Sequence, residues 1–187
     1  LRTTVTSRYY EGIDVSANNG GVGDAIVKPT FTESRINNSY DDYGTYLYAT
    51  ISSTGTAEVS PVASKSHFRG DDEAFYAYAA GAGTKGKARV AGSFTDSSFA
   101  SQEDNAVYSE AYNVGGAAEL LTRYTRCTAE APQDYAYEFY AYVTGDNATS
   151  ANCAPVISGG SEKYARGIPV SLRVVSGHRD TGFTECP

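Results

Sequence analysis

The sequence predicts an all-β fold, a β-sandwich of mostly antiparallel strands with at most short helices. Three observations favour this class. Apolar and polar residues alternate with a period of two, Tyr and β-branched residues fill the alternating runs, and clusters of Gly, Asn, Asp and Ser separate them. Such alternation is typical of strands with one buried face. The 187 residues match one domain and no linker divides them, so we expect a single domain over residues 1–187.

Four segments alternate clearly enough to be predicted as strands. They lie at 43–51, 73–80, 135–143 and 168–175. In the first and third of them, Tyr occurs on both faces. A Tyr ring buries a large area, while its hydroxyl tolerates water or a hydrogen-bond partner. Such a strand could face the core on one side and a neighbour, a sugar or a subunit on the other. The Tyr residues could also reflect β-propensity alone.

Weaker patterns occupy the rest of the chain. Less regular alternation predicts strands at 3–10, 24–32, 57–64, 87–94 and 119–128. Helical spacing is confined to 101–112 and 117–124. We predict that the first strand is a terminal edge strand, although in a polymer it could be donated to the open sheet edge of the next subunit. Many short strands between turns, without an internal repeat at a fixed period, favour a sandwich or a barrel.

Composition and charge exclude several kinds of partner. The net charge is −7, and the 15 Lys and Arg residues form no cluster, which argues against a nucleic-acid partner or an anionic membrane surface. No apolar run approaches the roughly 20 residues of a transmembrane helix. The chain begins at Leu1 and contains no Met, so we expect a mature form whose targeting segment was removed. Together with the abundance of Ser, Thr, Gly, Asn and Tyr, this predicts a secreted, extracellular or cell-surface location.

Three cysteines, Cys127, Cys153 and Cys186, predict one disulfide and one leftover thiol in an oxidising compartment. The sequence leaves three pairings open. A bond between Cys153 and Cys186 would close the last segment against the body. The odd thiol could be buried, bridge two subunits or bind metal. Asn37 and Asn147 begin Asn-x-Ser/Thr sequons and are candidate glycosylation sites in a glycosylating host.

Candidate catalytic residues are few. There are only two histidines, His67 and His178, and the chain contains no P-loop, no dinucleotide-binding motif and no His-Glu-x-x-His. Acidic runs at 41–42 and 71–73 offer oxygen ligands of the type that calcium prefers. No twelve-residue calcium-loop pattern accompanies them, so solvated acidic turns are the favoured interpretation.

The last segment carries the sharpest motif, because residues 176–187 read SGHRDTGFTECP. This resembles the last zinc-ligand segment of the peptidoglycan-recognition and N-acetylmuramoyl-L-alanine amidase family, in which Gly-His-Arg-Asp is followed by Thr-x-Cys-Pro. The resemblance covers residues 158–187 only. It implies a zinc ion held by His178 and Cys186, with His67 as the third ligand. Such a zinc ion would lower the pKa of a bound water to roughly 7 and polarise the scissile amide.

These observations predict a secreted or cell-surface structural or adhesive β-protein without a cofactor. It would work through its faces and edges, by self-association into a filament or layer through strand addition, or by adhesion to carbohydrate. Two alternatives remain open. One is the zinc-dependent N-acetylmuramoyl-L-alanine amidase acting on peptidoglycan that the resemblance implies. The other is a monomeric carbohydrate-binding module, which would show an exposed row of Tyr on one sheet face.

Overall fold

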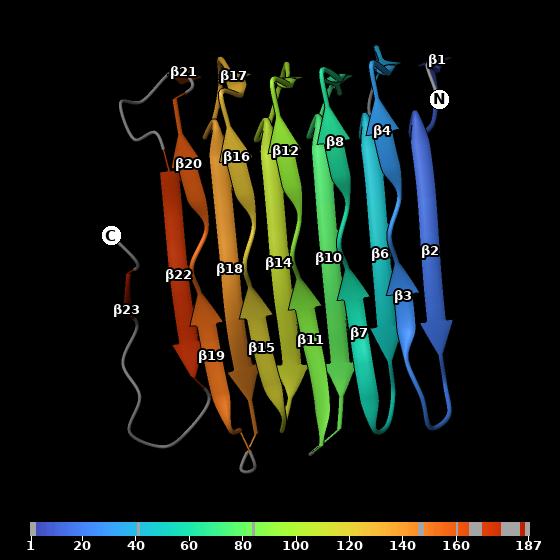
Figure 1. Cartoon of the computed structure of the whole chain (residues 1–187), viewed down its shortest axis with the longest axis vertical. Helices are drawn as coiled ribbons and strands as arrows, with labels where there is room; N and C mark the ends of the chain where they lie inside the picture. The colour runs from blue at the N-terminus through green and yellow to red at the C-terminus, as the bar shows by residue number, and fades with distance from the viewer. Residues whose placement is uncertain are drawn as a thin grey trace.

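The chain folds as a parallel β-solenoid, in which it winds as a coil and every turn of the coil stacks on the previous one (Figure 1). The computed structural model describes residues 3–40, 42–83, 85–145, 148–159, 161–164, 170–176 and 184–185. The all-β prediction is confirmed. The predicted β-sandwich of mostly antiparallel strands is wrong, because every strand pairing in the described ranges is parallel except the last one, between β22 and β23.

Each coil contributes one strand to each of four sheets. Sheet I contains β2 (Ile13–Asn19), β6 (Thr45–Ile51), β10 (Phe75–Ala82), β14 (Val107–Val114), β18 (Tyr137–Thr144), β22 (Val170–Ser176) and β23 (Thr184–Glu185). Sheet II contains β3 (Ala25–Val27), β7 (Gly55–Val59), β11 (Gly86–Val90), β15 (Ala117–Leu120) and β19 (Ser150–Cys153). Sheet III contains β4 (Thr30–Thr32), β8 (Val62–Ser64), β12 (Ser93–Thr95), β16 (Arg123–Thr125) and β20 (Val156–Ser158). Sheet IV contains β1 (Thr4–Ser7), β5 (Arg35–Asn38), β9 (His67–Arg69), β13 (Ser98–Ala100), β17 (Thr128–Ala131) and β21 (Ser161–Tyr164).

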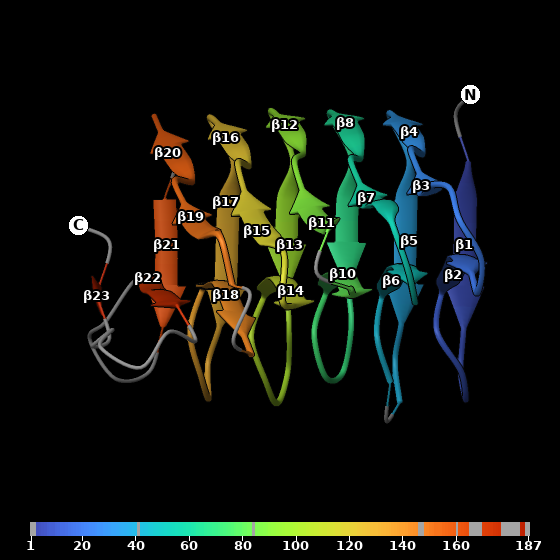
Figure 2. The same ribbon diagram turned by 90° about the horizontal axis from the view of Figure 1, so that it is seen from below.

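The four sheets enclose a flattened core. The strands of sheet I run in one direction along one broad wall, and those of sheets II and III run back along the opposite wall (Figure 1). Sheet IV joins the two walls along one side (Figure 2). The loops that lead from sheet IV to sheet I extend beyond the strands of sheet I, so they form a rim along its outer face (Figure 2).

The segments predicted as helices, 101–112 and 117–124, contain no helix and consist of strands with turns before or between them. Residues 107–114 are β14, which alternates between the core and the outer face, and β15 and β16 occupy most of the second segment. The described residues contain no helix, so none that could cross a membrane. Short apolar spacings fit either period, and pairing with the strands on both sides decides in favour of a strand.

The chain has an internal repeat whose period is not fixed, which is why the sequence did not reveal it. Pairing places one residue of each coil at the same level of sheet I, and these residues are Ile13, Thr45, Phe75, Val107, Tyr137 and Val170. The intervals between them vary by up to three residues, because the loops differ in length. A repeat with unequal intervals leaves no fixed period in the sequence.

The corner between sheets III and IV is built in the same way in each coil. Its first residue has a left-handed backbone conformation, with φ between 48° and 52° at Glu33, Lys65, Asp96 and Arg126. L-residues adopt this region at a cost of roughly 1–2 kcal/mol. Each corner residue donates its backbone N–H to a carbonyl of the next coil, for example Lys65 to Thr95 at 3.0 Å. These bonds hold every corner directly above the next.

A column of buried hydroxyls follows the corners. Ser34, Ser66 and Ser97 come directly after the left-handed residues, and Cys127 occupies the same position in the next coil. The backbone N–H of Ser34 donates to Ser66 Oγ, and that of Ser66 donates to Ser97 Oγ, both at 3.2 Å. Each Ser hydroxyl also donates to the carbonyl two residues earlier. The column therefore satisfies polar groups that the tight corner buries.

A continuous row of aromatic rings fills the side of the core next to the corners. The rings of Phe68 and Phe99 stack at 5.2 Å, and those of Phe94 and Tyr124 stack at 4.7 Å. A small side chain in one core column is balanced by a large one in the next. Ala63 lies between two aromatic residues of its own column in sheet III, and Phe68 of the same coil fills the adjacent space. Close packing of this kind supplies most of the stability.

Charged side chains alternate in sign along the outside of sheet II. Arg89 lies between Glu58 and Glu119 in register, and its guanidinium is 2.9 Å from the first carboxylate and 3.1 Å from the second. Lys87 adds a contact of 2.8 Å to Glu119. Hydrogen bonds from Lys87 and Arg89 lower the pKa of Glu119 despite partial burial.

Sheet IV includes the first strand of the chain. β1 pairs in parallel with β5, with Val5 opposite Ile36. The interpretation of residues 3–10 as a strand donated to another subunit therefore finds no support in this arrangement, since β1 already has a partner in its own chain.

We expect Phe94→Ala to lower the free energy of unfolding by about 3–5 kcal/mol, because it removes a fully buried ring that contacts Phe75, Phe99 and Tyr124. Urea denaturation measures this loss. Val62→Ala, on the exposed side of sheet III, is the control and should change stability little. Equal losses in the two variants would contradict the packing described here.

Arg89→Glu should destabilise the protein more than Arg89→Gln, because it places three carboxylates in one column. The difference between the two variants should shrink as salt is added, since salt screens charges at the surface. Thermal denaturation at low and high ionic strength tests both statements. A difference that does not depend on salt would show that packing, rather than charge, is responsible.

Candidate functional site

The outer face of sheet I carries the largest group of tyrosines in the molecule. Alternate side chains of each strand point into the core and the others point outward. We call the outward set the tyrosine face, and its members are Tyr46, Tyr48, Tyr76, Tyr78, Tyr108, Tyr112, Tyr140 and Tyr142. All of them are partly exposed. These strands therefore have one side in the core and present Tyr on the other side, and what that outer side meets remains a prediction.

Stacking between coils fixes the tyrosine rings. Tyr76 and Tyr108 lie 4.8 Å apart with planes 15° from parallel, and Tyr48 and Tyr78 lie 5.5 Å apart with planes 7° from parallel. The rings therefore cover one another's faces along the solenoid, and their edges and hydroxyls meet the solvent. Because each ring is held by its neighbours, the face is rigid before any ligand binds.

Two carboxylates lie among the tyrosines. Glu110 accepts hydrogen bonds from the hydroxyls of Tyr108, at 2.7 Å, and Tyr142, at 2.6 Å. Glu138 accepts from the hydroxyl of Tyr140 and from the side-chain amide of Asn105, the latter at 3.1 Å. These bonds orient the phenol groups and place negative charge at fixed points of the face.

Burial and the nearby carboxylates keep the phenols protonated. Burial, followed by the charge of Glu110, raises the pKa of Tyr78 to about 12. Burial likewise raises the pKa of Tyr108, with a further contribution from its hydrogen bond to Glu110. The face therefore presents neutral hydroxyl groups, which can donate or accept hydrogen bonds, throughout the neutral pH range.

A shallow trough crosses the tyrosine face near the ends of the strands. Its volume is about 360 Å³. Thr50 and Ala80, which are neighbours in register, line it together with the rings of Tyr48 and Tyr78, and Tyr112 follows Ala80 in the same register. The trough therefore combines aromatic rings with small side chains, as ligand sites often do.

Acidic residues occupy the rim beside the tyrosine face. An aspartate lies three residues before each of four successive sheet I strands, at Asp42, Asp72, Asp104 and Asp134. Glu73, which follows one of them, is buried. Burial, and then the charges of Asp104, Asp72 and Glu138, raise the pKa of Glu73 to about 8. No group of His, Cys, Asp and Glu in the described residues has the geometry of a metal site.

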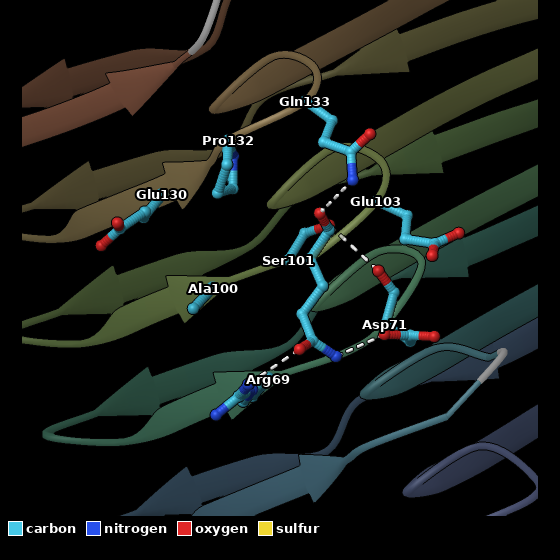
Figure 3. A pocket seen from close by; sticks show the side chains of 9 residues that line it. Arg69, Asp71, Ala100, Ser101, Glu103, Glu130, Pro132 and Gln133 are labelled. Carbon is cyan, nitrogen blue, oxygen red and sulfur yellow. Dashed lines mark hydrogen bonds between the residues drawn. The ribbon is translucent and has the colours of Figure 1, made fainter.

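A second depression, of about 650 Å³, lies on the outer side of the same loops (Figure 3). Gln102 connects two charged residues there. Its side-chain oxygen accepts a hydrogen bond from Arg69 at 3.0 Å, and its side-chain amide donates to Asp71. The side chain of Gln133 reaches across from the next coil to the backbone carbonyl of Gln102, at 3.2 Å. The polar groups here bind one another and thereby stabilise the rim.

Of the three predicted zinc ligands, His67 alone lies among the described residues. His67 is exposed on the outer face of β9, where its Nδ1 is 2.6 Å from Ser98 Oγ. It shares a depression of about 440 Å³ with Arg35, Asn37 and Arg69. His178 and Cys186 lie outside the described residues, so the zinc ligand set implied by the amidase resemblance remains a prediction.

The predicted disulfide does not occur in the described part of the chain. Cys127 and Cys153 are both buried and are not joined to each other. Cys127 occupies a serine position of the corner column, and its thiol donates to the carbonyl of Thr125 at 3.6 Å. Cys153 fills the core position that Leu120 holds in the previous coil. Both therefore serve as small buried side chains. Cys186, the other member of the suggested pair with Cys153, is not described.

The sequon at Asn37 lies in β5, where Asn37 is half-buried opposite Arg69. Asn147, at the other sequon, falls outside the described residues. Glycosylation at either position remains a prediction.

Sequence reasoning did not single out Glu110, Glu138 or the trough. The signal was present as Tyr-x-Tyr at 46–48 and 76–78, which strand pairing places side by side, and as Tyr-x-Tyr at 140–142, which pairs with Glu110 and Tyr112. Recognising this pattern from the sequence requires the number of residues between equivalent positions on successive coils. Comparison with protein-family models, with curated proteins and with solved structures found no match to this chain.

The buried Glu73 predicts a pH-dependent stability. Its pKa of about 8 in the folded protein lies above the ordinary value of 4.5, so its contribution to stability is complete below pH 4.5 and is lost as the pH rises through 8. We expect the melting temperature to fall between pH 5 and pH 9, and to fall less in Glu73→Gln. The exposed Glu103→Gln is the matched control and should follow the wild type. Identical pH profiles for Glu73→Gln and wild type would contradict the assignment.

Proposed function

We propose that this repeat β-protein binds a carbohydrate chain on its tyrosine face. The observation that carries the proposal is the rigid outer lattice of stacked tyrosines on sheet I. Sugar rings have apolar C–H faces and hydroxyl edges, so they suit a surface that offers both aromatic ring edges and phenol hydroxyls. The secreted or cell-surface location expected from the composition is consistent with such a ligand.

The charge on the face supports a neutral polyol rather than an anionic partner. Glu110 and Glu138 lie among the tyrosines, and the rim carries a row of aspartates. Phosphate groups of a nucleic acid would be repelled there, while sugar hydroxyls can donate hydrogen bonds to carboxylates.

The shape of the face supports an extended ligand. Equivalent side chains recur from coil to coil at the strand spacing, about 4.8 Å. A polymer with repeating units can therefore make similar contacts on several successive coils. The many weak contacts of such a chain add up, because one bound unit raises the effective concentration of the next.

We expect Tyr46→Thr to weaken oligosaccharide binding roughly two- to tenfold, because a lost aromatic contact is worth roughly 0.5–1.5 kcal/mol. A panel of immobilised neutral and acidic hexasaccharides identifies the ligand, and titration calorimetry measures its affinity. The control Val62→Thr changes an outward strand residue on sheet III and should bind as the wild type does. The proposal fails if the wild type binds no member of the panel, or if both variants bind equally.

A further inference from the structure

The outward residues of sheet I form rows that cross the strands, and the row that contains Ala80 is a column of rings with an interruption. Its members in register are Asn18, Thr50, Ala80, Tyr112 and Tyr142. Tyr112 and Tyr142 stack at 4.6 Å with planes 28° from parallel. The column of rings stops at Tyr112, because the next position toward the N-terminus holds Ala80 and the one after it holds Thr50.

Tyr112 is held as a fixed platform at the end of the column. Tyr142 covers one face of the Tyr112 ring, and the hydroxyl of Tyr112 lies 3.0 Å from Thr144 Oγ1. The other face is turned toward β10, where Ala80 offers only a methyl group. The trough of about 360 Å³ therefore lies where the next ring of the column would stand.

Building on the carbohydrate-binding function proposed above, we propose that one sugar ring of the bound chain occupies this trough and stacks on Tyr112 as the next member of the column. The volume lies at the lower end of the range of ligand pockets, about 300–1,000 Å³, and suits one or two rings. Tyr48 and Tyr78 stack on each other and line the side of the trough, so their rings restrict how the ligand can tilt.

The far end of the trough is polar, which favours a sugar over an aromatic ligand. Asn18 and Thr50 lie there, and the hydroxyl of Thr50 donates to the side-chain oxygen of Asn18 at 2.5 Å. That bond uses the oxygen of Asn18 and leaves its amide N–H groups without a hydrogen-bond partner among the described residues. A sugar hydroxyl can accept from these N–H groups while the C–H face of the ring covers Tyr112.

Ala80→Tyr is the decisive variant, because it adds a ring to the column at the position where we place the sugar. We expect affinity for the hexasaccharide selected from the panel to fall at least tenfold, while the melting temperature stays level or rises. Val62→Tyr introduces the same side chain at an exposed strand position of sheet III and should leave affinity unchanged.

Two substitutions at the platform separate the ring from its hydroxyl. Tyr112→Thr should weaken binding about tenfold, whereas Tyr112→Phe keeps the ring and should stay within about twofold of the wild type. The chain contains no Trp, so tyrosine fluorescence of the full-length protein reports both folding and titration with the hexasaccharide.

The outcomes distinguish this site from the general function. If Tyr46→Thr weakens binding and Ala80→Tyr does not, the face binds carbohydrate but the trough is not the subsite. If the wild type binds no oligosaccharide, the proposed function itself fails. Binding of phenol that is lost in Ala80→Tyr, without binding of any sugar, would identify a site for aromatic rings and overturn the assignment to a sugar.

Discussion

In-register parallel pairing places every side chain beside its equivalents on the neighbouring coils, about 4.8 Å away. The corner between sheets III and IV maintains this register. There, left-handed residues such as Lys65 and buried hydroxyls such as Ser66 repeat from coil to coil and bond to the coil that follows. The strain of the left-handed residues is offset because each corner forms hydrogen bonds with the coil before it and with the coil after it. The aromatic core and the tyrosine face depend on this register, since a slip by one residue would exchange the inner and outer side chains.

Because equivalent positions on successive coils carry similar side chains, the stacking has opposite effects on the tyrosine face and on the acidic rim. Stacked rings attract one another, so repetition stabilises the tyrosine face. Stacked carboxylates repel, so repetition in the rim opposes folding. Burial raises the pKa of Glu73 most, and the charges of Asp104, Asp72 and Glu138 raise it further. Asn105 reduces part of this repulsion by donating to both Asp104 and Glu138.

The sequence predicted most strands but not their arrangement. Segment 43–51 contains β6, and segments 73–80, 135–143 and 168–175 cover all but the last one or two residues of β10, β18 and β22. Alternation with a period of two has the same appearance in parallel and antiparallel sheets, so it could not distinguish a solenoid from a sandwich. The repeat was hidden because loop lengths differ between coils. Outward tyrosines were expected, yet the gap above Ala80 depends on pairing between residues about thirty apart in the chain, and no local pattern records such pairing.

The alternation of charge between coils limits how such a chain can change length. At the corners, Glu33, Lys65, Asp96 and Arg126 change sign at each step, and on sheet II Glu58, Arg89 and Glu119 do the same. Duplicating a single coil would bring two identical charges together in both columns at once, whereas duplicating two adjacent coils would preserve both sequences of sign. Adding or removing an even number of coils would therefore keep both alternations of charge, whereas an odd number would break both of them.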